Sequence, residues 1–160
     1  MADGRVTGFW HAGVTVREMG EALRFYRDTL GLEIEDQYEI KGDYAGPIVG
    51  VDPESMLVVF LTVPNSEAKI ELFEYRGIER HSASARPCDY GAGHFCLYVD
   101  DLDSIHARLI EAGFSARGPV IAIDRGPRAG AKVVYTIDPD GYHVELYQLP
   151  DGSAAGGAPG

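Results

Sequence analysis

Hydrophobic and polar residues alternate along short stretches of the first half of the chain, and between two of these stretches the spacing becomes helical. Residues 9–16 alternate with a period of two and predict a strand. The apolar positions of residues 18–30 recur every three or four residues and predict a helix that ends at Gly31. Residues 41–50 contain turn residues and no sustained period, so we interpret them as a loop or lid. Three more strands are predicted at residues 32–40, 56–63 and 69–75.

The second half of the chain returns to the same order of elements. Residues 93–99 predict a strand, and residues 100–112 predict a helix that ends at Gly113. A strand interrupted near Gly118 and Pro119 follows at residues 114–124. The last predicted elements are two strands and the tight turn between them, at residues 131–137, 142–149 and 138–141.

The two halves are copies of one βαβββ unit. His94 follows His11 by 83 residues, whereas Glu145 follows Glu71 by 74, so the second copy is about nine residues shorter. The difference falls at the predicted loop. The fold class is therefore predicted to be α+β, with two tandem βαβββ modules forming a curved sheet around a cleft. The predicted boundaries are an N-terminal extension (1–8), a first module (9–76), a linker (77–91), a second module (92–150) and a disordered tail (151–160).

Composition and charge narrow the classes of partner. The formal net charge is −11 and no basic stripe is visible, which argues against nucleic acid. No apolar run approaches the roughly 18 residues of a membrane span. No secretory signal follows the N-terminus, so we expect a cytoplasmic protein with no membrane partner. Cys88 and Cys96 are too few for a disulfide framework and are not spaced as a zinc pair.

Four residues in equivalent places of the two copies can ligate a metal. The alternation places His11 and His94 on the strand face turned away from the helix, and it places Glu71 and Glu145 on the matching face of the last strand. If the two inner faces meet, these residues converge on one site for a divalent metal such as Fe, Ni, Co, Zn or Mn. Two open positions would remain for a substrate with neighbouring oxygens. The alternative is that duplication copied a histidine without a function and that the glutamates are edge-strand charges.

The same faces carry residues that could line a substrate pocket. They are Phe73, Tyr75, Cys96, Tyr98, Tyr135, His143 and Tyr147. Aromatic side chains would give the pocket an apolar wall with a few hydroxyl groups, although core packing also explains them. His143 has the strand parity of Glu145 and could act as a proton shuttle beside the metal. Alternatively, it faces solvent just past the turn.

Several motifs together resemble the vicinal oxygen chelate superfamily, which includes glyoxalase I, bleomycin resistance proteins and extradiol dioxygenases. The matching segments are His11 with residues 14–16, FYRDTLGL at 25–32, IELF at 70–73, GHF at 93–95, VDDL at 99–102 and DPDGYHVEL at 138–146. The resemblance implies that His11, Glu71, His94 and Glu145 are the metal ligands. This set resembles glyoxalase I more than the superfamily's epimerases, which usually have Gln at the position of Glu71 and a second His at the position of Phe95.

From the resemblance we expect a divalent-metal-dependent lyase, isomerase or epimerase that acts on a small substrate with vicinal oxygens. Glu71 or Glu145 would be the general base. A second possibility is an Fe(II)-dependent extradiol-type dioxygenase that uses His11, His94 and Glu145 as ligands. A third is a non-catalytic protein that binds a drug or natural product. A homodimer is expected, and the two copies could pair within one chain or between two chains.

Overall fold

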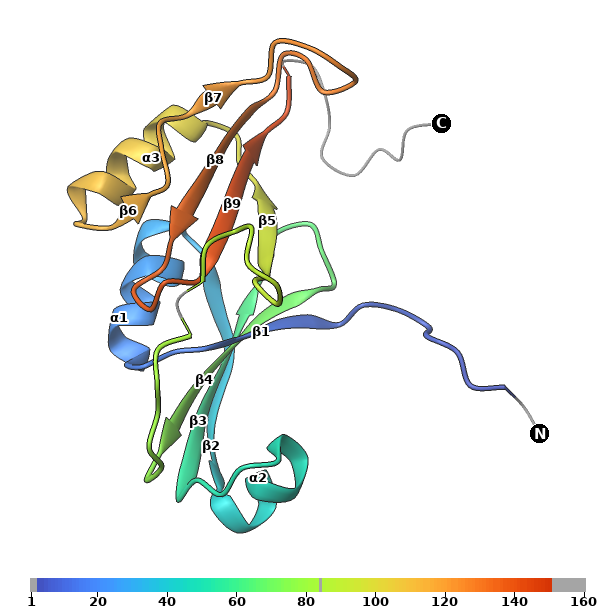
Figure 1. Ribbon diagram of the computed structural model, residues 1–160, viewed down its shortest axis with the longest axis vertical. Helices are drawn as coiled ribbons and strands as arrows, with labels where there is room; N and C mark the ends of the chain where they lie inside the picture. Colours follow the sequence, from blue (N-terminus) through green and yellow to red (C-terminus); the bar gives the residue numbers. More distant parts are fainter. Residues whose placement is uncertain (1–2, 84, 151–160) are drawn as a thin grey trace. The chain divides into compact units, whose positions relative to one another are not determined.

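The computed structural model describes residues 3–83 and 85–150, which form two compact units (Figure 1). Unit 1 contains the residues up to Gly20 together with Gly31–Glu79, and unit 2 contains Glu21–Leu30 together with the residues from Arg80 onward. The predicted disordered tail, 151–160, lies outside the described residues. No helix in the described part of the chain has the length and apolar character needed to cross a membrane.

Unit 1 is built on an open four-stranded sheet in the order β1-β4-β3-β2 (Figure 1). Strands β1 and β4 run parallel, whereas β4 with β3 and β3 with β2 run antiparallel. The strands are β1 (His11–Thr15), β2 (Glu33–Lys41), β3 (Ser55–Thr62) and β4 (Lys69–Arg76). All four predicted strands of the first copy are confirmed, with ends that differ by one or two residues.

The two faces of this sheet differ because side chains alternate along each strand. One face buries Val14, Leu61 and Leu72. The other face carries Glu71, and on it Met56, Val58 and Phe60 form a buried cluster with Ala45. The partly buried Ile40, Val49, Phe73 and Tyr75 pack against that cluster. A carboxylate therefore lies on the same face as a small apolar core.

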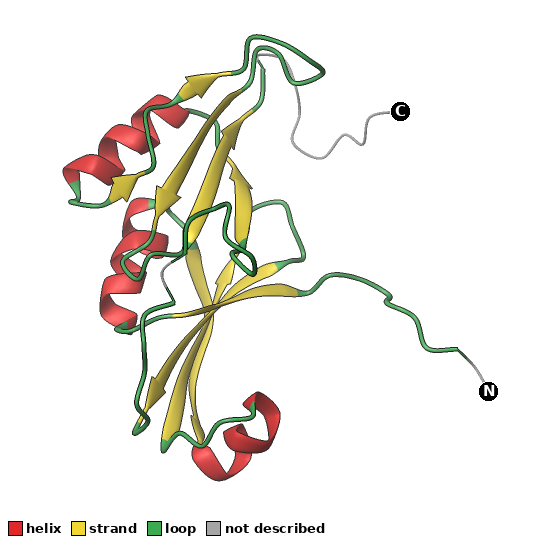
Figure 2. Cartoon of the chain, viewed as in Figure 1, coloured by secondary structure: helices red, strands yellow, loops and turns green. Residues whose placement is uncertain are grey.

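The prediction of a loop or lid at residues 41–50 is wrong, because helix α2 (Gly42–Val49) lies there (Figure 2). Its sequence carries two glycines and Pro47, which lower helix propensity. Packing explains the helix. Ala45 is buried in the Met56 cluster, and a Cβ atom at Gly42 would collide with the backbone oxygen of Pro53. Glycine is required for this close approach, which no periodicity in the sequence reveals.

Unit 2 repeats the sheet with a divided strand. Its order is β5-β9-β8-β6, and β7 also pairs with β8. Strands β5 and β9 are parallel, and the other pairings are antiparallel. The strands are β5 (His94–Tyr98), β6 (Ser115–Ala116), β7 (Ile121–Ala122), β8 (Lys132–Ile137) and β9 (His143–Gln148). The predicted interruption near Gly118 and Pro119 is confirmed by the gap between β6 and β7.

The helix of the first copy contributes to the core of unit 2. It consists of α1 (Met19–Leu23) and a π-helical turn, η1 (Arg24–Thr29), and the boundary between the units falls inside α1. Phe25 and Tyr26 are fully buried, and the Phe25 ring lies 5.1 Å from that of Phe114. Tyr26 donates a hydrogen bond of 2.9 Å to Asp138.

Helix α3 (Leu102–Glu111) begins where the acidic turn predicts, because the Asp101 carboxylate accepts a hydrogen bond from the Ser104 backbone amide. Leu102 and Leu109 form its buried face. The α+β fold class and the repeated order of elements are confirmed. The module boundaries at 9–76, 77–91 and 92–150 stay a prediction.

Candidate functional site

In unit 1, His11 and Glu71 come together from two neighbouring parallel strands. His11 Nε2 lies 2.8 Å from Glu71 Oε2, and Glu71 is only 7% exposed. Burial raises the pKa of Glu71, while the nearby His11 acts in the opposite direction. The Nδ1 atom of His11 is buried and has no hydrogen-bond partner among the described residues. The arrangement is an imidazole–carboxylate pair with a buried carboxylate and a half-buried imidazole.

In unit 2, His94 and Glu145 form the equivalent pair, again on neighbouring parallel strands. His94 Nε2 lies 3.1 Å from Glu145 Oε2, and the pair is more accessible than its counterpart in unit 1. The Tyr135 hydroxyl lies 3.0 Å from the same His94 nitrogen. In Tyr135 itself, burial and the Glu145 carboxylate both raise the pKa of the phenol.

The two pairs share one strand register. Gly13, two residues after His11, lies opposite Glu71 in the β1–β4 ladder. Cys96, two residues after His94, lies opposite Glu145 in the β5–β9 ladder. In a parallel ladder this diagonal spacing places the histidine and the glutamate on one face. The four residues predicted as ligands therefore lie in two pairs of the same construction, and their binding of a metal stays a prediction.

The donor atoms of each pair fit a divalent metal ion. Imidazole nitrogen and carboxylate oxygen bind such ions at about 2.0–2.2 Å, so two ligands at a right angle lie about 3 Å apart. The observed separations of 2.8 and 3.1 Å are close to that value, which is also the length of a hydrogen bond between the two groups. Among the described residues no group of three or more His, Cys, Asp or Glu side chains gathers at one point.

Aromatic rings surround the pair of unit 1. Phe60 is opposite Glu71 in the β3–β4 ladder, and its ring meets the edge of His11 at 5.9 Å. Trp10 stacks on Phe60 at 5.6 Å and lies 4.6 Å from His11. The predicted wall residues Phe73 and Tyr75 are half-buried on the same strand as Glu71. Sequence reasoning did not include Trp10 in the site, although its position directly before His11 could have indicated it.

The neighbours of the unit 2 pair are more polar. The predicted residues Cys96 and Tyr98 are exposed on β5, and Tyr135 and Tyr147 are half-buried on β8 and β9. Desolvation of the sulfur, followed by the Glu145 carboxylate, raises the pKa of Cys96 to about 12. The Tyr147 hydroxyl is buried without a hydrogen-bond partner in the described part of the chain.

The alternative that His143 faces solvent is wrong, because the residue is 3% exposed. The exposed Arg117 donates from Nε to His143 Nε2 at 2.8 Å, which assigns the remaining proton of a neutral imidazole to Nδ1. Burial, followed by Arg117 and His94, lowers the pKa of His143. Arg117 was not predicted as part of the site, since it lies beyond the short strand β6 and carries no motif.

A family model and two curated relatives show which proteins this chain resembles. The model described as the Glyoxalase/Bleomycin resistance protein/Dioxygenase superfamily matches residues 8–146. A 2-epi-5-epi-valiolone epimerase of Actinomyces sp is 27% identical over 89% of this chain and 80% of its own length. A probable lactoylglutathione lyase of Synechocystis is 27% identical over 86% of this chain and 92% of its own length.

Solved structures agree on the fold. A glyoxalase family protein from Bacillus cereus superposes with a TM-score of 0.78 at 20% identity, covering 94% of this chain and 99% of its own. The trypanothione-dependent glyoxalase I of Leishmania major superposes with a TM-score of 0.59 at 21% identity, covering 91% and 88%. At these identities the likeness concerns the fold.

Proposed function

This chain belongs to the Glyoxalase/Bleomycin resistance protein/Dioxygenase superfamily, and from that premise we propose that it is a divalent-metal-dependent lyase, isomerase or epimerase. In this proposal His11, Glu71, His94 and Glu145 hold one metal ion, either within a chain or between the chains of a homodimer. The substrate is a small molecule with two neighbouring oxygens. The ion would be Fe, Ni, Co, Zn or Mn, which accept mixed nitrogen and oxygen ligands.

The observation that carries the proposal is the repetition of the imidazole–carboxylate pair. Two pairs with N–O separations of 2.8 and 3.1 Å occupy the same register positions of two sheets. Glu71 is 7% exposed, and a buried carboxylate needs a compensating partner, which His11 and a bound cation could both supply. The names of the relatives, an epimerase and a lactoylglutathione lyase, support an enzyme of this type.

The residues of the chain divide the chemistry between them. A bound divalent ion supplies Lewis acidity that acidifies the carbon-bound proton next to a chelated carbonyl. Glu71 or Glu145 would loosen from the metal to take that proton as the general base, and it would return the proton to the same or the neighbouring carbon.

Metal content and proton exchange test the proposal. The purified protein should hold a stoichiometric divalent metal, and it should catalyse exchange of the α-proton of a hydroxyketone in D2O, followed by NMR. Dialysis against a chelator should abolish the exchange, and adding back metal should restore it. Glu71→Gln should reduce exchange at least about 100-fold if Glu71 is the base, whereas Glu33→Gln, on the exposed edge strand, should not.

Two results would overturn the proposed class. A protein without stoichiometric metal that binds its ligand equally well after chelation would be a binding protein. Oxygen consumption with a catechol would instead indicate an extradiol-type dioxygenase.

A further inference from the structure

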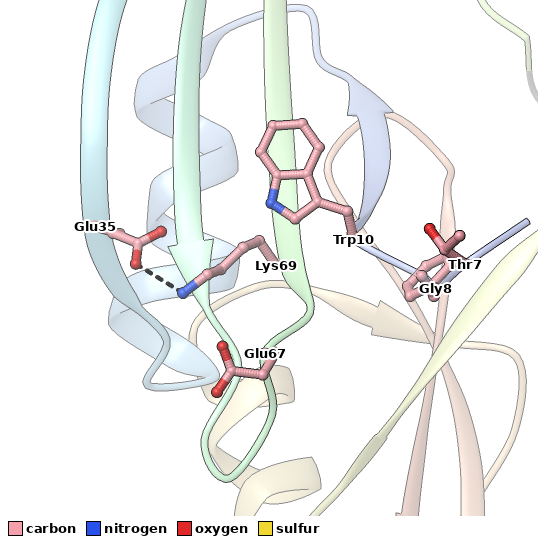
Figure 3. A pocket seen from close by; sticks show the side chains of 7 residues that line it. Thr7, Gly8, Trp10, Glu35, Glu67 and Lys69 are labelled. Atoms are coloured by element: carbon pink, nitrogen blue, oxygen red, sulfur yellow. Dashed lines mark hydrogen bonds and ion pairs between the residues drawn. The ribbon is translucent and has the colours of Figure 1, made fainter.

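Next to the His11–Glu71 pair, unit 1 has an open hollow of about 570 Å³. It is lined by Thr7, Gly8, Phe9, Trp10, Glu35, Glu67 and Lys69. Figure 3 shows the Trp10 indole turned toward the strands, with Lys69 paired to Glu35 and Glu67 close by. Lys69 is the register partner of His11, so the hollow borders the proposed metal-binding pair.

We propose that this hollow binds the body of the substrate and that this body is an uncharged, polyhydroxylated ring. This inference rests on the proposed function only in taking the His11–Glu71 pair as part of the reacting site. The ligand class is argued from the residues that line the hollow.

The charges of the hollow disfavour an anionic ligand. Its one cation among the described residues, Lys69, is 2.7 Å from Glu35 and only 18% exposed at its side chain. Glu67 is exposed and has no hydrogen bond or ion pair with any described residue, so the lining carries a net negative charge. A carboxylate-bearing ligand would face two carboxylates and would have to separate Lys69 from Glu35. An uncharged ligand meets neither cost.

The same residues suit hydroxyl groups. Carboxylates accept hydrogen bonds from hydroxyls, and such charge-assisted bonds are about twice as strong as neutral ones. Glu35 and Glu67 can each accept from a ring hydroxyl, while the Lys69 ammonium can donate to one. A ligand with several hydroxyls on one ring would satisfy these three groups together.

Trp10 supplies the flat surface that a saturated ring needs. One face of the indole is stacked on Phe60, and the residue is nevertheless 65% exposed. The face of an aromatic ring is electron-rich and attracts the slightly positive C–H bonds of a saturated ring. Because the indole lies 4.6 Å from the His11 ring, a ligand stacked on it would be held beside the reacting pair.

Trp10 is also the single tryptophan of the chain, so its fluorescence reports on this hollow alone. The full-length protein, freed of metal by chelator dialysis, would be titrated with 2-keto-myo-inositol, with cyclohexanone and with glutathione. We expect saturable quenching by the keto-inositol and at least tenfold weaker effects of the other two compounds. Quenching by glutathione at equal or lower concentration would overturn the proposal, as would equal responses to keto-inositol and cyclohexanone.

A matched pair of variants locates the ligand. Glu67→Gln should weaken keto-inositol binding three- to tenfold, because it removes a charged acceptor from the hollow. Asp43→Asn removes the same charge from α2, outside the hollow, and should leave binding unchanged. Equal effects of the two variants would refute the site. The titration contains no metal, so it tests the hollow separately from the proposed reaction. If the protein binds keto-inositol but never binds a metal, the proposed reaction is refuted and the proposed ligand of the hollow is retained.

Discussion

The His11–Glu71 pair of unit 1 and the His94–Glu145 pair of unit 2 have the same backbone frame and different neighbours. In both, a histidine on the first strand meets a glutamate one diagonal step along a parallel strand. Both N–O separations fall near 3 Å. The two pairs therefore occupy the same positions and the same register in the two units.

The side chains around the two pairs differ. Across the ladder from the glutamate, unit 1 has Phe60 where unit 2 has Tyr135. Opposite the histidine, unit 1 has Lys69 where unit 2 has His143. The equivalents of Phe73 and Gly13 are Tyr147 and Cys96. Next to its pair, unit 1 thus has two phenylalanine rings and a lysine, whereas unit 2 has two phenols, a thiol and an imidazole.

The largest expected effect on metal binding comes from removing one histidine at a time. His11→Ala and His94→Ala should each reduce metal affinity by more than about 100-fold, because even the partners of ligands are worth 10- to 100-fold. The equality of the two losses is the informative result, and metal titration monitored by calorimetry measures it. His106→Ala, which changes a histidine of α3, serves as the control. A loss confined to one of the two variants would show that the pairs do not serve one ion.

Helix α2 is the largest difference between the copies, and Gly42→Ala tests what it does. The added Cβ would meet the backbone of Pro53, so the variant should lose about 1–3 kcal/mol of unfolding free energy. Gly20→Ala, in α1 with open space around it, should instead gain about 0.5–1 kcal/mol. Chemical denaturation measures both. Equal changes in the two variants would show that α2 does not depend on the close approach at Gly42.

Helix α2 also marks where sequence reasoning ends. Strand alternation is a local signal, so the strands and the faces of His11, Glu71, His94 and Glu145 could be predicted from it. The helix at Gly42–Val49 forms because Ala45 packs on a cluster from β3, and such a tertiary contact overrides weak propensity.

The same limit applies to the site's surroundings. Arg117 and His143 are 26 residues apart, and Tyr26 and Asp138 are 112 apart. No spacing rule connects such pairs. Parity placed His143 on the correct face, but its burial depends on the chain around it. Trp10 precedes the predicted strand residue His11 directly, and only the stacking on Phe60 shows that both rings turn to one face.

The turn before β9 holds a buried carboxyl group, that of Asp138, which should make stability depend on pH. The substitution Asp138→Asn tests this. Burial raises the pKa of Asp138, although hydrogen bonds from Tyr142, Tyr26 and Asp140 act in the opposite direction. As pH rises through the ordinary carboxyl range, the unfolded chain therefore loses this proton before the folded protein does, and stability falls.

Asparagine keeps the acceptor for the Tyr142 and Asp140 amides and does not titrate. Between about pH 3 and pH 6, the wild-type unfolding free energy should therefore decline relative to that of Asp138→Asn, by at most about 1.4 kcal/mol per pH unit. Denaturation series across this range measure the difference. Parallel curves would contradict the raised pKa.

The smallest expected effect concerns the contact that distinguishes the unit 2 pair, between Arg117 and His143. Arg117→Gln removes a cation that lowers the pKa of His143, while the glutamine amide can still donate to its Nε2. The pKa of His143 should rise toward its ordinary value without reaching it, because burial is the main cause of its lowering and remains in the variant. NMR titration of the histidine ring protons measures the shift, with Arg125→Gln as the control for an exposed arginine paired elsewhere.

Since a lowered folded-state pKa costs stability as pH falls through the histidine range, the variant should also lose less stability on acidification than the wild type. A His143 signal that does not move would mean that Arg117 fixes the orientation of the imidazole without controlling its charge, and the polar character of unit 2 would then rest on Tyr135 and Tyr147.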